Sequence, residues 1–565
     1  MKKALILLNL LLAGAACYAQ PVGRQQAEAL AKQWLGGEVS EMGRPLEAEA
    51  KGRNGGDDTP CYYVFGRATG GFVIVGGETR LPAIVAYAKE AAWGNEDLPP
   101  ALEGFLNAYT RLVQEVRQGE EVLIPLRSME EAVPVVEPLC KTAWNQQAPY
   151  NSLCPVDGTK TCPVGCVALA MAQIMKYYEW PLHGRGKVYY TPQRLPSAGM
   201  LYVDFSESVY DWDAMLNTTA ELKANKAAAD AVAKLCYDCG VSSRMEYGAE
   251  SSGTYDDYAI QSMYENFGYK ASTIKIVYRD CYATQEEWDA IWKAELDEGR
   301  PVLYSGATTG GDGHEFVVDG YDSNGFVHVN WGWGGVSDGY FDVTVLNATA
   351  SQSFSSGQGM IIGIVPDYTG KDVVHAPVVP YMASPFSLTG TLLLGKNKLV
   401  TVSNVYNRSR SAQTWQVGVG LYSLDGMFIA NMAVNEVSKA IPAMSGIASS
   451  TVMMDIPVTT PNGEYVVCAI FRSKAEEEWM FPNVVGGATN NRVYTTIADG
   501  VATFAPSSSS IYNICIDDSD EGNVEVMSHQ YFDLTGKPVK EPQKGIMMDV
   551  QTFSNGEKKV QKVLF

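Results

Sequence analysis

Cys166 and His314 are the two residues of this chain whose types and surroundings could provide a nucleophile and its base. Cys166 follows the helix-disrupting residues Pro163 and Gly165 and precedes a dozen good helix formers, which end before Pro181. The pattern predicts that Cys166 lies in the first turn of a buried helix, where free N–H groups and the helix dipole favour an anion. We therefore expect a favoured thiolate, the nucleophilic form of cysteine. A buried cysteine is otherwise a small hydrophobic core residue. The nucleophilic role therefore requires a second residue that could act as its base.

The chain has only five histidines, so few residues could serve as the base for Cys166. His314 follows a glycine-rich approach and precedes a predicted strand at Phe316–Val318, where glycine lets backbone and substrate come close. His328 alternates with valines and is interpreted as a structural core residue, and His183 as a surface residue. The remaining two, His375 and His529, fall in the β-rich C-terminal part. His314 is therefore the candidate base.

Nucleophilic catalysis also needs a group that orients the base and donors for the developing oxyanion. His314 follows Cys166 by roughly 150 residues, which suits a papain-like arrangement of a helix-borne cysteine and a strand-borne histidine. Asn330 is the candidate orienting residue, and Trp331 beside it is expected to shield that hydrogen bond from water. Gln146, together with the backbone N–H of Cys166, is the candidate oxyanion donor.

The elements that position these residues fall into successive segments. Helical spacing is found at 24–35 and 97–118, and two strands are predicted at 61–66 and 70–77, which makes a compact N-terminal unit. Residues 118–140 lose periodicity and are interpreted as an exposed linker. Further helices are expected near 219–239 and 284–298, and strands and glycines dominate the second half of this segment. Beyond residue 370, short alternating strands at 399–407, 415–426 and 463–473 predict a β-sandwich.

Composition excludes some classes of partner. The 565-residue chain has a formal net charge of −21, so nucleic acid is not an expected partner. Lys2 and Lys3, an apolar run and Cys17-Tyr18-Ala19 form a secretory signal pattern over residues 1–19. Lipidation of Cys17 is the alternative. No later segment is apolar and long enough to predict a membrane span.

The remaining cysteines and acidic residues do not predict a metal site. Cys236 and Cys239 form a lone CxxC without a second ligand pair, and packing or an incidental disulfide explains it better than zinc. Cys154 and Cys162 could pair after export, and the sequence leaves this open. The acidic cluster that begins at Asp517 is interpreted as a solvated turn rather than a calcium site. We expect no metal and no cofactor.

Four ordered blocks of sequence resemble one known family. TAWNQQAPYN, CPVGCVALAMAQIMKYYEWP, GGDGHEFVVDGYD and HVNWGWGGVSDGYF together look like the streptopain family of secreted cysteine peptidases, in the papain-like clan. The segment LCYDCGVSSRMEYGAESSGT at 235–254 is similar to a family segment that borders the substrate cleft. The N-terminal unit resembles the inhibitory propeptide of that family. The C-terminal segment resembles the end domains of proteins secreted by Bacteroidetes-type bacteria.

The resemblance implies roles by position. It implies that Cys166 is the nucleophile, that His314 is the base and then the acid, and that the third residue is in the pair Asn330 and Trp331. It implies an oxyanion donor at Gln146, although Gln147 stands beside it and leaves the assignment open by one residue. The residues implied to contact substrate are Ser252, Gly253, Gly332 and Trp333.

The expected fold is therefore α+β, with a papain-like two-part catalytic domain between a small α+β propeptide domain and C-terminal all-β domains. The expected boundaries are 1–19 for the signal peptide, 20–127 for the propeptide, 128–368 for the peptidase, 369–506 for the β-sandwich and 507–565 for a small β domain. This last domain is either a sorting signal or a hairpin that closes the sandwich.

The implied function is an exported cysteine endopeptidase that cleaves protein substrates through a thioester acyl-enzyme and is kept inactive by its own propeptide. Its localisation is expected to be secreted or outer-surface associated, with periplasmic or lipid-anchored forms as alternatives. Two other functions remain: a Cys-His hydrolase or acyltransferase of the transglutaminase-like or peptidoglycan-cleaving kind, and an inactive surface-binding protein. Retention of Cys166, His314, Gln146 and Asn330 argues against the inactive protein. The resemblance also implies an apolar side chain next to the scissile bond.

Overall fold

The structure is a computed structural model. It describes residues 20–42, 59–94, 98–120, 132–279, 285–307, 313–344, 358–372, 380–384, 386–409, 412–424, 427–436, 440–443, 445–473, 479–484, 492–505, 526–532, 538–539, 546–553 and 558–564. The predicted signal peptide, the acidic cluster at Asp517 and the glycines at 310 and 311 lie outside these residues. The chain divides into two compact units, Met1–Ile514 and Cys515–Phe565, which are described separately.

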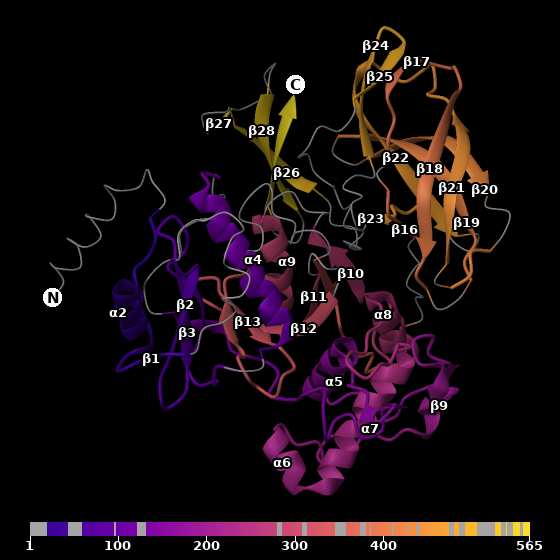
Figure 1. The fold of residues 1–565 in the computed structure, drawn as a ribbon. Coiled ribbons are helices and arrows are strands. Elements are labelled where there is room, and N and C mark those ends of the chain that lie inside the picture. Colours follow the sequence, from indigo (N-terminus) through magenta and orange to yellow (C-terminus); the bar gives the residue numbers. More distant parts are fainter. Residues whose placement is uncertain are drawn as a thin grey trace. The chain divides into compact units, whose positions relative to one another are not determined.

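An 11-stranded sheet runs through the first unit (Figure 1). Its main path is β1 (Ser40–Glu41), β2 (Tyr62–Gly66), β3 (Phe72–Gly76), β4 (Ile84–Ala88), β14 (Gly339–Phe341), β13 (Val327–Asn330), β12 (Gly313–Asp322), β11 (Val302–Ala307), β15 (Gly359–Ile362) and β10 (Lys275–Tyr278). All of these pairings are antiparallel. The first four strands belong to the N-terminal segment, so one sheet joins the predicted propeptide to the predicted catalytic segment.

The N-terminal helices form where helical spacing predicts them. α2 (Arg24–Leu35) packs on β2 and β3, and α4 (Pro100–Arg117) begins with proline in its first turn, where the missing N–H costs nothing. The predicted apolar face of α4 is confirmed, because Leu102, Phe105, Leu106, Tyr109 and Leu112 are all buried. These side chains share a core with β12, β13 and β14 and with α9 (Gln285–Asp297). The propeptide helix is therefore part of the same core as the catalytic strands.

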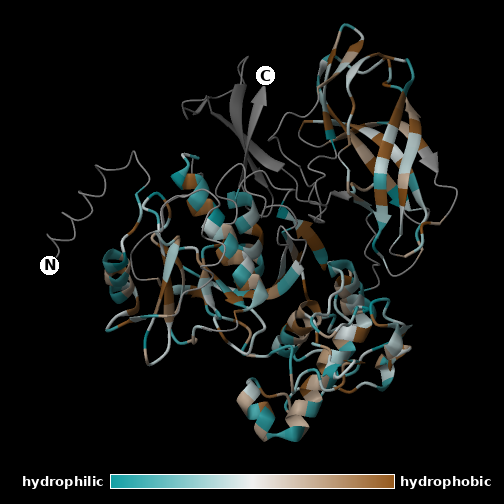
Figure 2. Ribbon diagram, in the orientation of Figure 1, coloured by the Kyte–Doolittle hydropathy of each residue, from teal (hydrophilic) through white to brown (hydrophobic). Residues whose placement is uncertain are grey.

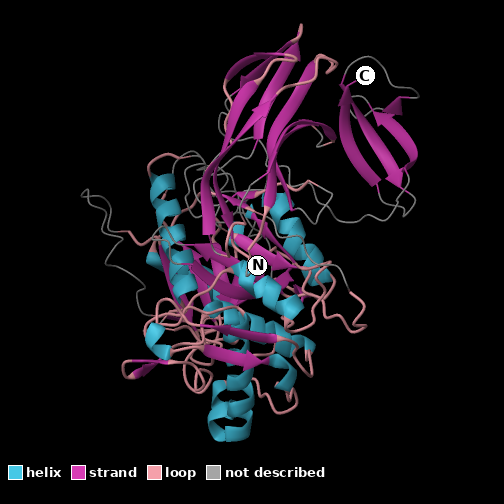
Figure 3. Ribbon diagram, turned by 90° about the vertical axis from the view of Figure 1, so that its right-hand side faces the viewer, coloured by secondary structure: helices cyan, strands magenta, loops and turns pink. Residues whose placement is uncertain are grey.

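A second core holds the helices on the other side of β12. It contains α5 (Cys166–Tyr178), α7 (Lys226–Ser242) and α8 (Asp256–Glu265), with Leu303, Val317 and Ile361 from the sheet. The smaller elements around it are α6 (Thr219–Ala224), η1 (Pro196–Ala198), η2 (Phe205–Glu207), and the hairpins β6 (Val156–Asp157) with β7 (Lys160–Thr161) and β8 (Lys187–Tyr190) with β9 (Leu201–Asp204). Figure 1 labels these helices, and Figure 3 shows helices and strands of the molecule in separate colours. The α+β class is confirmed.

The interpretation of 118–140 as an exposed linker is wrong for its second half. Residues Pro134–Val136 form β5, which pairs with β12, and the Leu139 N–H donates to the Asp319 carbonyl at 2.9 Å. Ala132 and Cys140 are buried. The sequence here has no clear alternation because one short edge strand, with proline at its start, provides too few residues for a pattern. Residues 121–131 lie outside the described ranges.

The C-terminal half of the first unit contains two sheets of a β-sandwich, as the alternating pattern predicts. One sheet has the order β21 (Ser445–Met454), β18 (Lys398–Asn407), β16 (Tyr381–Met382) and β23 (Asn483–Val484). The other has the order β17 (Gly390–Leu393), β25 (Val501–Ala505), β24 (Arg492–Ala498), β22 (Gly463–Ser473), β19 (Trp415–Ser423) and β20 (Phe428–Glu436). Hydrophobic and hydrophilic residues alternate along these strands (Figure 2), and the apolar ones form a core of their own.

The second unit contains one four-stranded antiparallel sheet. Its order is β27 (Pro538–Val539), β26 (Val526–Phe532), β28 (Ile546–Phe553) and β29 (Lys558–Leu564). This strand content agrees with the strand-turn-strand texture of the sequence.

Candidate active site

Cys166 is the first residue of α5, as predicted, and it is partly buried. Gly165 caps the helix with a φ of 92°, a conformation that glycine adopts without strain. A side chain at Gly165 would also collide with its surroundings, because a Cβ there would lie 2.6 Å from Met245 Cε and 3.1 Å from the Ser252 carbonyl oxygen. The glycine therefore allows the 245–252 segment to lie directly against the helix start that carries the candidate nucleophile.

The electrostatic surroundings of Cys166 differ from the expectation. Burial, together with the negative charges of Glu315 and Asp256, raises the pKa of its thiol to about 11. The backbone N–H groups of Glu315 and Val167 oppose this rise by hydrogen bonding to the sulfur. The expected effect of the helix start is thus present through Val167, but burial outweighs it. The prediction of a favoured thiolate is wrong for the chain in this state.

His314 is the second residue of β12 and lies opposite Gly306 of β11. Along β12, Val317 packs with α5, whereas Phe316 and Val318 pack with α4. Because side chains alternate along a strand, His314 belongs to the face of Phe316, which α4 covers, and Glu315 belongs to the face of α5. The strand starts earlier than predicted and includes His314 itself, so pairing with β11 fixes the backbone of the candidate base.

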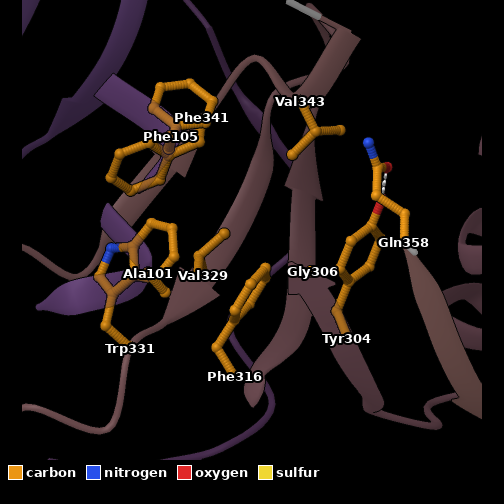
Figure 4. Close-up of a pocket in the computed structure, with 10 residues that line it drawn as sticks. All are labelled: Ala101, Phe105, Tyr304, Gly306, Phe316, Val329, Trp331, Phe341, Val343 and Gln358. Carbon is orange, nitrogen blue, oxygen red and sulfur yellow. Dashed lines mark hydrogen bonds between the residues drawn. The ribbon is translucent and has the colours of Figure 1, made fainter. Parts of the chain in front are cut away.

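Trp331 lies on the α4 face as well. Its ring packs 4.8 Å from that of Phe316 and 4.9 Å from that of Phe341, and its Nε1 donates to the Ser337 carbonyl. Figure 4 shows these rings beside a small apolar pocket that Ala101 and Phe105 of α4 also line. The tryptophan expected to shield the catalytic hydrogen bond is therefore in contact with the propeptide helix.

The structure places the two candidate amide side chains as follows. Asn330 is buried, its Nδ2 donates to the Thr142 carbonyl at 2.6 Å, and its Oδ1 accepts from the Gly332 N–H. Gln146 is half-buried, and its backbone carbonyl accepts from the N–H of Val164, two residues before Cys166. Gln147 is exposed. The backbone of Gln146 is thus bonded to the residues that lead into α5. The side chain of Asn330 instead links Thr142 to the loop after β13.

The residues predicted to contact substrate lie on two segments beside α5. Ser252 is buried and Gly253 is half-buried, in a short bridge with Glu246. Gly332 has a φ of 68°, and a Cβ there would lie 2.8 Å from Leu169 Cδ2 of α5. Trp333 is partly buried. Two segments that are far apart in the sequence therefore lie against α5 or its first residues.

Two acidic residues beside Cys166 were not predicted. Glu315 is 4% exposed, and burial and the neighbouring Asp256 raise its pKa well above its ordinary value. Asp256 begins α8, and its Oδ2 accepts from Ser305 Oγ at 3.1 Å. The available signal was a glutamate inside the apolar strand HEFVV, next to the candidate histidine. Asp256 gave no signal, since α8 itself was not predicted.

The sequence of this chain matches two known protein families. Residues 144–341 match the Peptidase C10 family, and residues 19–113 match the Spi protease inhibitor family. Streptopain of Streptococcus pyogenes is 33% identical over 330 residues, which cover 54% of this chain and 80% of streptopain. The chain belongs to the peptidase C10 family. This C10 peptidase is a cysteine peptidase that is made as a zymogen with an inhibitor-type N-terminal domain.

Two further relatives have a similar sequence identity to this chain. The thiol protease/hemagglutinin PrtT of Porphyromonas gingivalis is 30% identical over 373 residues, which cover 62% of the C10 peptidase and 42% of PrtT. The solved structure of a prointerpain A fragment from Prevotella intermedia is 30% identical, with a TM-score of 0.48, and covers 58% of this chain and 100% of the fragment.

The described part of the C10 peptidase contains neither a membrane-spanning helix nor a cluster of metal-binding side chains. None of its described helices is long and apolar enough to cross a membrane. Its described residues include no group of three or more His, Cys, Asp or Glu side chains that could hold a metal ion.

Proposed function

We propose that the C10 peptidase hydrolyses protein substrates with Cys166 as nucleophile and His314 as general base and then acid. The observation that carries this proposal is the position of Cys166 at the start of α5, which packs beside the strand β12 that has His314 as its second residue. The thiolate attacks the scissile carbonyl carbon and forms a thioester as the amine leaves with a proton from the imidazole. Water, activated by His314, then releases the acid and regenerates the thiol.

The oxyanion of the tetrahedral intermediate is proposed to accept hydrogen bonds from the Gln146 side chain and the Cys166 N–H. The hydrogen bond from the Val164 N–H to the backbone carbonyl of Gln146 supports this role, because it holds the glutamine close to the residues that precede Cys166. Asn330 and Trp331 are proposed to orient and shield His314. Ser252, Gly253, Gly332 and Trp333 are proposed to line the substrate cleft.

Latency is proposed to depend on the propeptide helix α4. It covers the face of β12 to which His314 belongs and packs Phe105 against Phe341 at 5.4 Å. Removal of α4 uncovers this face, and the His314 side chain, near the start of its strand, is then able to turn toward Cys166. The segment 118–140 is proposed to contain the activating cleavage. The proposed domains are residues 20–127 for the propeptide, 128–368 for the peptidase, 369–506 for the sandwich and 507–565 for the last β domain.

We also propose that the C10 peptidase is exported through its signal-like N-terminus, residues 1–19. Its partners are then extracellular protein or peptide substrates and its own propeptide, and the reaction uses no metal or cofactor. Attachment to the outer surface through the C-terminal domain or a lipidated Cys17 is an extension of this proposal.

The decisive experiment compares the purified full-length precursor with Cys166→Ala and His314→Ala under reducing conditions. Cys468→Ala, which removes a buried thiol of the sandwich, is the matched control. We expect self-processing and epoxysuccinyl labelling in the unchanged protein and the control, with processing lost in both active-site variants and labelling lost in Cys166→Ala. Normal processing by purified Cys166→Ala would refute the proposal.

A further inference from the structure

A pair of carboxyl groups lies beside the candidate nucleophile. Glu315 extends from β12 toward α5, and Asp256 stands at the start of α8. The two carboxyls interact directly with each other, and each acts on the Cys166 thiol. Two neighbouring carboxylates repel each other when both are charged, so this arrangement favours either a shared proton or a cation between them.

The hydrogen bonds around this pair are incomplete. Asp256 is satisfied in part by Ser305, whose Oγ lies 3.1 Å from Asp256 Oδ2. Within the part of the chain that the structure describes, Glu315 Oε1 is buried and has no hydrogen-bond partner, and the same is true of Ser252 Oγ. Glu315 is 4% exposed and Ser252 is 8% exposed. Because buried polar atoms are normally paired, two unpaired acceptor oxygens close to the nucleophile indicate a missing donor.

This acidic cluster is not sealed in the core. Asp256 is only half-buried, and Tyr255, which precedes it, is 48% exposed. The Ser252 carbonyl lies against Gly165, the residue before Cys166. The cluster therefore extends from the surface at Tyr255 to the position of the reacting sulfur, as a subsite for a substrate side chain would.

A guanidinium group already stands at the outer end of the cluster. Arg408 of the sandwich lies with its Cζ 5.6 Å from the centre of the Tyr255 ring and 4.4 Å from that of Tyr381. Its charge lowers the pKa of Asp256, although burial raises that pKa more. The surface end of the cluster thus accommodates a planar cation, while no residue in the described ranges donates to Glu315 Oε1 at its inner end.

We propose that Glu315 and Asp256 form a subsite that binds a cationic side chain, arginine or lysine, of the substrate close to the scissile bond. The cation donates to Glu315 Oε1 and to the carboxylate of Asp256, which a neutral apolar side chain does not. This inference rests on the proposed function and names its substrate class. It replaces the sequence-based expectation of an apolar residue at that position.

The same contact couples recognition to chemistry. With the subsite empty, both carboxyls disfavour the Cys166 thiolate. A bound cation cancels their charge and favours the thiolate, so the correct substrate promotes formation of its own nucleophile. Charge on the substrate side chain should then affect kcat as well as KM.

The test uses the self-processed enzyme and fluorogenic tetrapeptides that carry arginine or citrulline at each position before the scissile bond. Citrulline has nearly the shape of arginine without its charge. We expect arginine to exceed citrulline in kcat/KM by about tenfold or more at one position. Glu315→Gln and Asp256→Asn should each reduce this ratio to about threefold or less. Glu250→Gln, which removes an exposed carboxylate paired with Lys160 at 2.5 Å, should leave the ratio unchanged.

The outcomes separate the two proposals. Cleavage of citrulline and arginine peptides at equal rates at every position by the unchanged enzyme overturns the subsite, and this result does not depend on any variant folding. A preference for arginine that persists in folded Glu315→Gln and Asp256→Asn overturns it too. If no peptide is cleaved and Cys166 is not labelled by an epoxysuccinyl inhibitor, it is the proposed peptidase function that fails.

Discussion

The hydroxyl of Tyr87 donates a hydrogen bond to Asp322 Oδ2 at 2.6 Å, across the junction between the N-terminal domain and the catalytic sheet. Tyr87 lies on β4 and is paired with Tyr340 of β14, on whose ring its own ring stacks with centroids 5.2 Å apart. Burial and the Asp322 carboxyl both raise the pKa of Tyr87, so the phenol remains a donor at all physiological pH values. The junction is therefore held by strand pairing, ring packing and one buried charged hydrogen bond.

Loss of this hydrogen bond should weaken latency. Tyr87→Phe removes the hydrogen bond from Tyr87 to Asp322 Oδ2, and the loss of such a bond in a buried setting costs about 1–3 kcal/mol. We expect faster self-processing of the precursor, by about five- to a hundredfold. The measurement is the half-time of precursor conversion, followed by gel or mass spectrometry. Tyr465→Phe, which removes a hydroxyl bonded to Pro461 in the sandwich, is the control. Equal half-times for Tyr87→Phe and unchanged precursor would show that this bond does not hold the propeptide.

The elements on each side of this junction were predictable from the sequence, but the junction was not. The helical spacing of Leu102, Phe105 and Leu106 fixes α4 and its buried face locally. The pairing of Ala86 with Phe341 joins residues far apart in the chain, and no periodicity within either strand encodes it. The same holds for the site. Cys166 and His314 stand in distinctive local contexts, whereas the contact of Glu315 with Asp256 arises only when β12 packs beside α8.

The thiol of Cys166 should react slowly in the precursor. A pKa of about 11 leaves about one thiolate in ten thousand at pH 7. We expect the rate of alkylation at Cys166 by iodoacetamide to rise with pH up to about 11, whereas an ordinary thiol levels off above about 8.5. Glu315→Gln removes a negative charge and should move the midpoint to lower pH. Site-resolved mass spectrometry measures both. A midpoint near 8.5 in the unchanged precursor, or no shift in Glu315→Gln, would contradict the electrostatic account.

Gln146 and Gln147 should differ in their effect on turnover. Removal of one oxyanion donor costs about a hundred- to a thousandfold in kcat with little change in KM. We expect Gln146→Ala to show this loss in the processed enzyme, because the Gln146 backbone is bonded to the approach to Cys166. Gln147→Ala, at the exposed neighbouring position, should stay near the unchanged rate. Peptide hydrolysis at saturating substrate tests this, and the reverse ranking of the two variants would move the donor to Gln147.

His328 should make the stability of the fold depend on pH. Its Nδ1 lies 2.6 Å from Asp319 Oδ1. Burial lowers the pKa of His328, but the charge and hydrogen bond of Asp319, with smaller effects from Asp338 and Glu137, raise it overall above 6.5. Asp338 titrates nearby, since burial raises its pKa to about 7. Tyr340 also faces the histidine, with ring centroids 5.1 Å apart.

Both shifts act in the same direction. A histidine with a raised pKa stabilises the fold fully below about pH 6.5, and this stabilisation is lost as pH rises through the higher folded-state value. An aspartate with a raised pKa likewise makes the folded state hold its proton longer, so stability falls between about pH 4 and 7. We therefore expect the free energy of unfolding, measured in urea in the Cys166→Ala background to prevent self-processing, to decrease from pH 5 to pH 9.

Substitution of the histidine separates the two contributions. His328→Gln should lower stability at pH 5–6 by about 3 kcal/mol or more, because it leaves the buried Asp319 carboxylate without its cation. It should also flatten the decrease above pH 6.5, which a loss of packing alone would not do. His183→Gln, at an exposed histidine, is the control and should keep the full slope. If His328→Gln retains that slope, the charged pair of His328 and Asp319 is not its origin, and Asp338 alone would have to account for it.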